Sequence, residues 1–143
     1  MLARRSPSGW PTTSERLERY TTVHHHVVFS GASVSPVARV GHTPDSTRAA
    51  GREVVTATRW ADDDGVFKIK EVAHGLARLT VDAETGTVVG YQGLHAHADS
   101  MVKTLQEIVE SELDVRAVPD RACYPTLPEL FDGLFRETAA ELD

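Results

Sequence analysis

Apolar and polar residues alternate in several short segments along the first two thirds of the chain. Residues 23–30 are rich in β-branched and aromatic types and stop at Gly31, which is typical of a strand. Beyond residue 53 the same period of two predicts strands in four segments, at residues 54–58, 66–72, 76–81 and 87–94. The polar loop between the last two segments ends in Gly86, which favours a hairpin. We therefore predict that these four strands form an antiparallel meander.

Beyond residue 97 the apolar residues follow the spacing of helices. One apolar stripe consists of Ala98, Met101, Val102, Leu105, Ile108, Val109 and Leu113. A second stripe occupies residues 127–135, and a shorter helix is predicted earlier, where Thr43 is placed to cap the first turn and Pro44 suits its first position. Strands followed by helices predict an α+β domain. We expect an antiparallel sheet with two C-terminal helices packed on it and a short helix after the first strand.

The length and composition of the chain are those of one globular domain. It has 143 residues, of which 41% are hydrophobic and 25% are charged. The first stretch mixes arginine and glutamate with serine, threonine, proline and glycine, which is typical of a loose arm. We expect an N-terminal arm over residues 1–21 and a single domain over residues 22–143.

The charge and the cysteine content narrow the possible partners and the compartment. Fifteen Lys and Arg against 21 Asp and Glu leave a formal net charge of −6, which argues against nucleic acid as a partner. No apolar run approaches the ~20 residues needed to cross a bilayer, so no membrane association is expected. The single cysteine, Cys123, has no intrachain disulfide partner. We expect a cytoplasmic protein.

The sharpest local chemical pattern joins two histidines and an aspartate. The stretch His95-Ala96-His97-Ala98-Asp99 resembles the start of the metal site in metallo-β-lactamase-type hydrolases. Zinc needs three or four converging ligands, whereas position 100 is Ser and no histidine follows residue 97. Exposed histidines at the end of a strand are the simpler interpretation. A metal-dependent hydrolase that uses His95, His97 and Asp99 remains a third hypothesis, and no metal ligand is assigned.

A second histidine cluster and the cysteine are weighed in the same way. On a strand His24 and His26 would share one face, but nothing in the sequence indicates that they converge with other ligands. We interpret the cluster His24–His26 as one side chain at a partly polar interface and the others in solvent. Cys123 has only Arg121 as a basic neighbour, so it is assigned to packing and not to nucleophilic chemistry.

The segment at residues 122–129 is the most informative one in the chain. Thr126 is followed three residues later by Glu129, which is the pattern of a capping box at the start of the second C-terminal helix. In such a box the glutamate accepts a hydrogen bond from the backbone of the capping residue. Glu129 therefore has a structural role that requires no chemistry.

This segment and those before it resemble the C-terminal dimerisation domain of FAD-dependent pyridine nucleotide-disulfide oxidoreductases, the dihydrolipoamide dehydrogenase and glutathione reductase group. The resemblance covers about residues 22–138. The matching pieces, in the family's order, are Val27–Ser30, Val40–Thr43, Arg48–Gly51, Leu76–Asp82, Thr85–Gly90, Ala98–Glu110 and Tyr124–Glu129. The last piece matches the signature His-Pro-Thr followed two residues later by Glu. The periodicity agrees independently with strands first and two helices last.

The resemblance implies roles for the residues of that last piece. Glu129 matches the acid of the family's His-Glu catalytic pair, and Tyr124 occupies the position of the histidine. Tyr124 and Pro125 would lie near the flavin of the partner subunit, with a cis peptide bond between them. A phenol of pKa ~10 is a poor substitute for an imidazole of ~6.5 when a thiol must exchange protons near neutral pH.

The function implied is that of an interface domain in a larger redox enzyme. We expect the dimerisation domain of a flavin-dependent NAD(P)H disulfide oxidoreductase that is dihydrolipoamide dehydrogenase-like. Because no glycine-rich dinucleotide turn occurs in the sequence, we expect it to be present without its FAD and NAD domains and to be inactive alone. FAD and NAD(P) would belong to the full-length protein. Partners would be a second copy, through residues 98–113 and 124–135, or a separate FAD- and NAD-binding polypeptide. A free-standing dimeric interaction module without redox role is the alternative.

Overall fold

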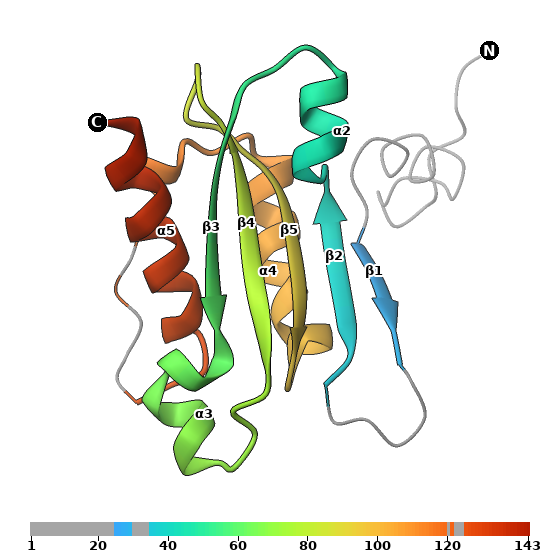
Figure 1. Cartoon of the computed structure of the whole chain (residues 1–143), viewed down its shortest axis with the longest axis vertical. Helices are drawn as coiled ribbons and strands as arrows, with labels where there is room; N and C mark the ends of the chain where they lie inside the picture. The colour runs from blue at the N-terminus through green and yellow to red at the C-terminus, as the bar shows by residue number, and fades with distance from the viewer. Residues whose placement is uncertain (1–24, 30–34, 120, 122–124) are drawn as a thin grey trace, which may run out of the picture.

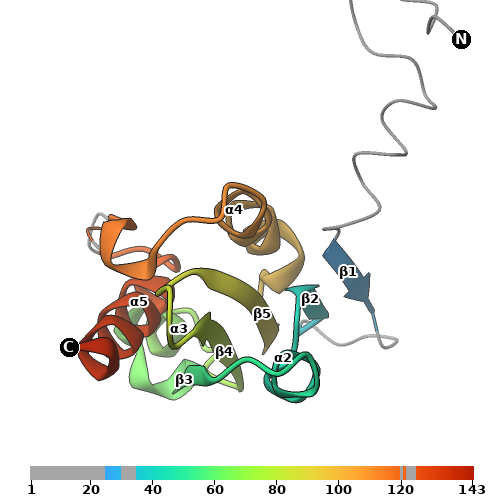
Figure 2. The same ribbon diagram turned by 90° about the horizontal axis from the view of Figure 1, so that it is seen from above.

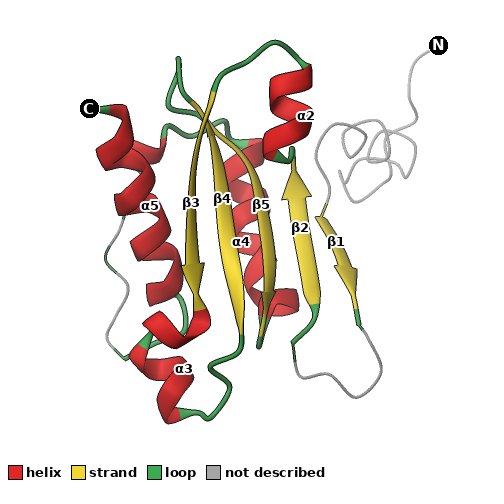
Figure 3. Ribbon diagram, viewed as in Figure 1, coloured by secondary structure: helices red, strands yellow, loops and turns green. Residues whose placement is uncertain are grey.

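A computed structural model of the chain describes residues 25–29, 35–119, 121 and 125–143. In these residues it shows an α+β fold with a five-stranded antiparallel sheet, as predicted (Figures 1 and 3). The strands are β1 (His25–Val28), β2 (Val37–Gly41), β3 (Val54–Trp60), β4 (Gly75–Asp82) and β5 (Val88–His95). The helices are α2 (Pro44–Ala49), α3 (Gly65–Ile69), α4 (Ala98–Glu110) and α5 (Glu129–Leu142), with short 3-10 turns at Ala61–Asp63 and Val115–Ala117. The expected boundary between residues 21 and 22 lies outside the described residues.

The sheet is only in part the predicted meander. Its strand order is β1-β2-β5-β4-β3, with every neighbouring pair antiparallel. Strands β3, β4 and β5 follow one another as a meander, whereas β2 joins the sheet beside β5, far from it in sequence. A register shift at Thr80/Val81 precedes the β4–β5 turn.

The two C-terminal helices cover one face of the sheet, as predicted. Helix α4 packs on β1, β2 and β5, and α5 packs on β3 and β4, while α2 lies on the opposite side (Figure 2). The core between sheet and helices includes Val40, Leu79 and Tyr91 from the strands, Leu105 from α4 and Phe131 from α5. The face of the sheet turned away from α4 and α5 is called the open face below.

The predicted strand at residues 66–72 is wrong, because this segment begins as helix α3. The side chain of Asp64 accepts a hydrogen bond from the N–H of Val66 at 2.9 Å and so caps the helix. The neighbouring residues Val66 and Phe67 are both buried, whereas a strand would turn one of them outward. A segment as short as residues 66–72 does not distinguish a strand from a helix by its pattern of apolar and polar residues.

Residues 37–41 form strand β2, which the hydrophobic pattern did not predict. Ala38 and Val40 are buried, whereas Val37 and Arg39 are exposed, so the alternation is that of a strand. The short helix therefore follows the second strand and not the first. Its predicted start is confirmed, since Thr43 Oγ1 accepts from the N–H of Ser46 at 3.1 Å. Within the described residues, no helix has the length and apolar character needed to span a membrane.

Candidate functional site

The acid of the predicted catalytic pair stands at the start of α5. Glu129 Oε2 accepts a hydrogen bond from the backbone N–H of Thr126 at 3.4 Å, which is one half of the expected capping box. The other half is missing, because Thr126 Oγ1 is buried without a partner in the described part of the chain. The predicted box is therefore formed only in part, and α5 begins at Glu129 itself, after Pro128, without a side-chain cap.

The packing of α5 determines where Glu129 lies. Leu130 and Phe131 follow it directly and are buried, and the Phe131 ring meets the edge of Tyr91 with ring centroids 5.4 Å apart. The first turn of α5 is thus anchored on the centre of β5. Tyr124, its peptide bond to Pro125, and Cys123 lie outside the described residues. Pro125 itself is exposed.

His95 is a core residue. It is fully buried, its Nδ1–H donates to the carbonyl of Ala96 at 2.8 Å, and its Nε2 accepts from the hydroxyl of Tyr91 at 2.6 Å. Burial lowers the pKa of His95, the bond to Ala96 works in the opposite direction, and nearby His97 adds to the lowering. Burial also raises the pKa of the Tyr91 phenol, which stays protonated. The pair is a neutral hydrogen bond inside the core.

The other residues of the proposed metal motif do not join His95. His97 is exposed and caps α4 in a left-handed conformation with φ 63°, and Asp99 is exposed in the first turn of that helix. Both ring nitrogens of His95 already have partners. Among the residues that the structure describes, no group of three or more His, Cys, Asp or Glu is arranged to hold a metal ion. The metal-dependent hydrolase hypothesis has no structural support here.

The first histidine cluster is divided between two faces of the sheet. His25 lies opposite Val40 on the side of the helices, and its Nδ1 is 2.5 Å from Oε1 of the buried Gln106 on α4. His26 lies opposite Arg39 on the open face. His24 is outside the described residues. The prediction that one of these histidines lies at a partly polar interface is therefore confirmed for His25.

The open face carries a row of apolar side chains that crosses all five strands. The row follows the register of the sheet and consists of Val28, Val37, Leu94, Leu76 and Trp60, called the apolar stripe below. Four of these side chains are strongly exposed, at 60% for Val28, 44% for Val37, 43% for Leu94 and 54% for Trp60. Scattered single apolar residues are normal on a surface, but a contiguous row marks a surface that another body covers.

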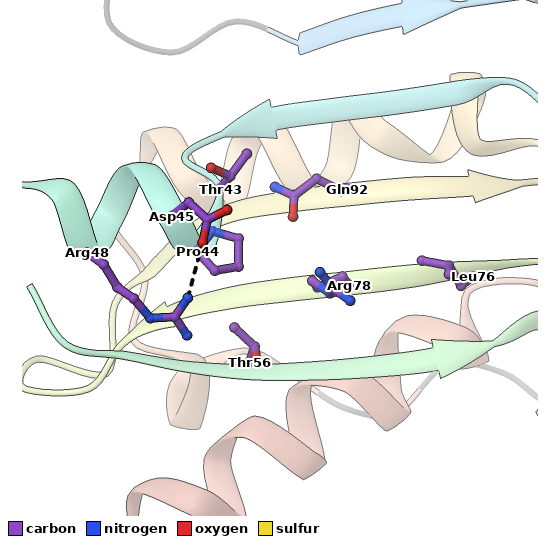
Figure 4. Close-up of a pocket in the computed structure, with 8 residues that line it drawn as sticks. All are labelled: Thr43, Pro44, Asp45, Arg48, Thr56, Leu76, Arg78 and Gln92. Atoms are coloured by element: carbon purple, nitrogen blue, oxygen red, sulfur yellow. Dashed lines mark hydrogen bonds and ion pairs between the residues drawn. The ribbon is translucent and has the colours of Figure 1, made fainter.

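A polar row lies next to the apolar stripe on the same face. It consists of Arg39, Gln92, Arg78 and Thr58, which are register neighbours on β2, β5, β4 and β3. Beside α2 the surface is hollowed into a cleft of about 630 Å³, whose lining includes Arg78 and Gln92 of this row and Leu76 of the apolar stripe (Figure 4). The open face thus combines an apolar stripe with a basic, concave region.

The outer surface of α4 is polar. Its apolar residues pack on the sheet, and the exposed positions include Lys103, Thr104, Glu107 and Glu110. Lys103 Nζ lies 3.5 Å from Glu107 Oε1, one turn apart on the same side of the helix. Sequence reasoning selected this helix as an interface by resemblance, and it missed the apolar stripe. Only the register could have revealed that stripe, because its members come from five separate segments.

Comparison with known proteins agrees with this fold. A family model described as the dimerisation domain of pyridine nucleotide-disulphide oxidoreductases matches residues 26–134. The chain is similar in structure to the HOCl-induced flavoprotein disulfide reductase RclA from Escherichia coli, with a TM-score of 0.71 and 19% identity, over 79% of this chain and 26% of that one.

Two further solved structures show the same fold. LpdA from Mycobacterium tuberculosis matches with a TM-score of 0.71 and 20% identity, over 80% of this chain and 24% of that one. A NAD-dependent persulfide reductase from A. fulgidus matches with a TM-score of 0.64 and 12% identity, over 84% of this chain and 23% of that one. The chain spans about a quarter of the length of these proteins. No curated protein matches the chain by sequence.

Proposed function

The chain belongs to the dimerisation domain family of the pyridine nucleotide-disulphide oxidoreductases, and from this premise we propose that it is the interface domain of a flavin-dependent NAD(P)H disulfide oxidoreductase, dihydrolipoamide dehydrogenase-like. The observation that carries the proposal is the uncovered apolar stripe, which a free-standing domain would have little reason to expose. The nucleotide-binding part of the enzyme would cover it, in the same polypeptide or in a separate one.

The helical side of the domain would contact a second copy. Lys103 and Glu107 lie one turn apart on the exposed side of α4. In a two-fold symmetric contact, if one position on the first copy meets a second position on the other copy, the reverse contact also forms. An axis that passes between Lys103 and Glu107 would therefore place Lys103 of each copy against Glu107 of the other copy. Polar residues do not disqualify such a surface, because interfaces as a whole are about as apolar as the rest of a protein surface.

The redox chemistry would require the rest of the enzyme. FAD and NAD(P) would supply hydride transfer there, and Pro125 with Tyr124 would lie at the edge of the partner subunit's flavin. Glu129 is positioned by its bond to the N–H of Thr126 and by the buried turn that follows, so a residue at position 124 would have an acid nearby along the chain. A phenol of ordinary pKa ~10 is a poor proton donor and acceptor for a thiol near neutral pH, and we propose that the chain alone catalyses no disulfide reduction.

Self-association is tested by sedimentation of the purified chain and of charge variants on α4. We expect a dimer, and Lys103→Glu should raise its dissociation constant by about tenfold or more, because the two-fold axis applies the like-charge contact twice. The double variant Lys103→Glu with Glu107→Lys should recover the dimer. Glu84→Lys, in the exposed β4–β5 turn, serves as the matched control. A monomer at high concentration would count against the proposal.

The alternative of an interaction module without a redox role is separated by a second measurement. The chain is mixed with FAD and NADPH and assayed on lipoamide and glutathione disulfide, alone and with its nucleotide-binding partner once that polypeptide is identified. Activity only in the combined sample supports the oxidoreductase role. A dimer that never restores activity to that partner supports the alternative.

A further inference from the structure

The cleft on the open face has walls from two kinds of element. Helix α2 and its N-cap form one wall through Thr43, Pro44 and Arg48. The floor is formed by outward side chains of the sheet, among them Arg78 and Leu76 (Figure 4). The cleft lies on the opposite side of the sheet from α4 and from Glu129. Its role is therefore independent of the proposed dimer contact.

The lining is more basic than acidic, although the whole chain has a formal net charge of −6. Arg48 comes from α2 and Arg78 from β4, and the only carboxylate in the lining is Asp45. The contact between Arg48 Nη1 and Asp45 Oδ1 is 3.4 Å long, and the two side chains are 57% and 97% exposed. An exposed pair of this kind contributes at most ~1 kcal/mol, so Arg48 remains available to a ligand.

Arg78 is held in place by the sheet. Its Nε donates to Thr58 Oγ1 on the neighbouring strand at 3.0 Å, which fixes the plane of the guanidinium group. The residue is exposed, so its guanidinium group can reach a ligand in the cleft. Planar guanidinium forks bind the paired oxygens of carboxylate and phosphate groups, and a fork that is already oriented loses less entropy on binding.

The remaining surface of the cleft is in part apolar, through Pro44 and Leu76. A cleft of about 630 Å³ has room for a small organic molecule. We propose that the cleft binds a small organic anion, with its phosphate or carboxylate group between Arg48 and Arg78 and its apolar part against Leu76. The proposal does not depend on any redox role of the chain. It shares Leu76 with the apolar stripe, so a ligand in the cleft and a body that covers the stripe would compete for that side chain.

The test is an NMR titration of the isotope-labelled chain with three probes. Phenyl phosphate and benzoate carry the same ring on two different anionic groups, and inorganic phosphate has no ring. We expect chemical-shift changes at Arg48, Arg78 and Leu76 that saturate as the probe is added. Inorganic phosphate should bind more weakly than phenyl phosphate, because it has no ring to contact Leu76. The tighter of the two ring compounds identifies the preferred anionic group.

Variants decide whether the two arginines carry the binding. Arg48→Gln and Arg78→Gln should each weaken binding by about tenfold or more, because each loses a charge-assisted hydrogen bond. Lys103→Gln, on α4 across the sheet, is the matched control and should bind as the unaltered chain does. Both arginines are exposed, and the spectra of the variants report directly whether they fold. Shifts that never saturate, or that persist unchanged in both arginine variants, would overturn the proposal.

Discussion

At the scale of single residues, one face of β5 carries a buried and closely packed group of side chains. Tyr91, Gly93 and His95 follow one another at intervals of two and point toward the helices, where the tyrosine hydroxyl donates to the imidazole. Phe67 closes the group from α3, with its ring edge-on to His95 and the ring centroids 5.7 Å apart. A buried polar pair of this kind is tolerated because both side chains find partners.

Protonation of His95 should destabilise the fold. Its folded pKa is lowered, so below pH ~6.5 the unfolded chain takes up a proton that the folded chain rejects. The contribution of neutral His95 to the free energy of unfolding should be fully present above pH ~6.5. As the pH drops toward the folded pKa, the free energy of unfolding should fall by up to about 1.4 kcal/mol per pH unit. Urea unfolding between pH 7.5 and 5.5 measures this slope. His95→Gln should reduce this slope, whereas His97→Gln, at an exposed position, should not change it. Equal slopes in the two variants would contradict the assignment of the pH dependence to His95.

Gly93 is required by the same pair. A Cβ atom at this position would lie 2.2 Å from the Tyr91 hydroxyl and 3.0 Å from His95 Nε2. Gly93→Ala should therefore cost about 1–3 kcal/mol of unfolding free energy through overpacking. Gly65→Ala is the matched control, because a Cβ there meets nothing within 4 Å. Chemical denaturation of both variants checks the prediction, which fails if the two lose the same amount.

At the scale of elements, the β4–β5 hairpin depends on one buried carboxylate. Asp82 accepts from the N–H groups of Glu84 at 2.8 Å and Thr85 at 3.1 Å, and Arg52 Nε lies 2.5 Å from its second oxygen. Burial alone would raise the pKa of Asp82, but these donors stabilise the carboxylate and hold its pKa below the ordinary value. The turn of the hairpin is thus organised from its first residue.

Asp82→Asn should destabilise the domain by about 2–3 kcal/mol, since it removes hydrogen bonds to a charged acceptor and leaves Arg52 without its partner. The stabilisation from the carboxylate should be present at neutral pH and lost as the pH falls below ~3.9 toward the folded pKa. Thermal and urea unfolding measure both effects. Asp45→Asn, whose side chain is 97% exposed, is the control and should change stability by less than ~1 kcal/mol.

At the scale of the whole molecule, the two faces of the sheet differ in kind. One is closed by α4 and α5, and the other leaves the apolar stripe open beside a basic cleft. In the longer proteins that share its fold, the matching region is about a quarter of the chain.

The isolated chain should bind an apolar fluorescent dye through the stripe. Leu94→Gln should lower the dye signal while leaving the unfolding free energy within about 0.5 kcal/mol, because a 43% exposed side chain contributes little to the core. Ile69→Gln is the matched control, since Ile69 is 73% exposed on α3 and does not belong to the stripe. Dye fluorescence and denaturation of the two variants decide the matter. A signal that falls equally in both would locate the dye elsewhere.

Local sequence patterns were sufficient for the class of fold and for its best-formed parts. The strands near residues 54–58, 76–81 and 87–94 and both C-terminal helices were predictable because each buries one face against the same core. The cap at Thr43 was predictable because its hydrogen bond spans only three residues. The recurrence of buried positions within one element is a local signal. The bond from the N–H of Thr126 to Glu129 was predictable from their spacing of three residues, whereas the other half of the expected box is absent.

Only the tertiary structure decided what depends on distant neighbours. Residues 37–41 are a strand because they pair with β5, and residues 65–69 are a helix because Val66 and Phe67 both reach the core. The contact between His25 and Gln106 and the apolar stripe both follow from register and helix placement. Those contacts join residues far apart in sequence, and their free energy appears only when the whole sheet has assembled, so no local pattern contains them.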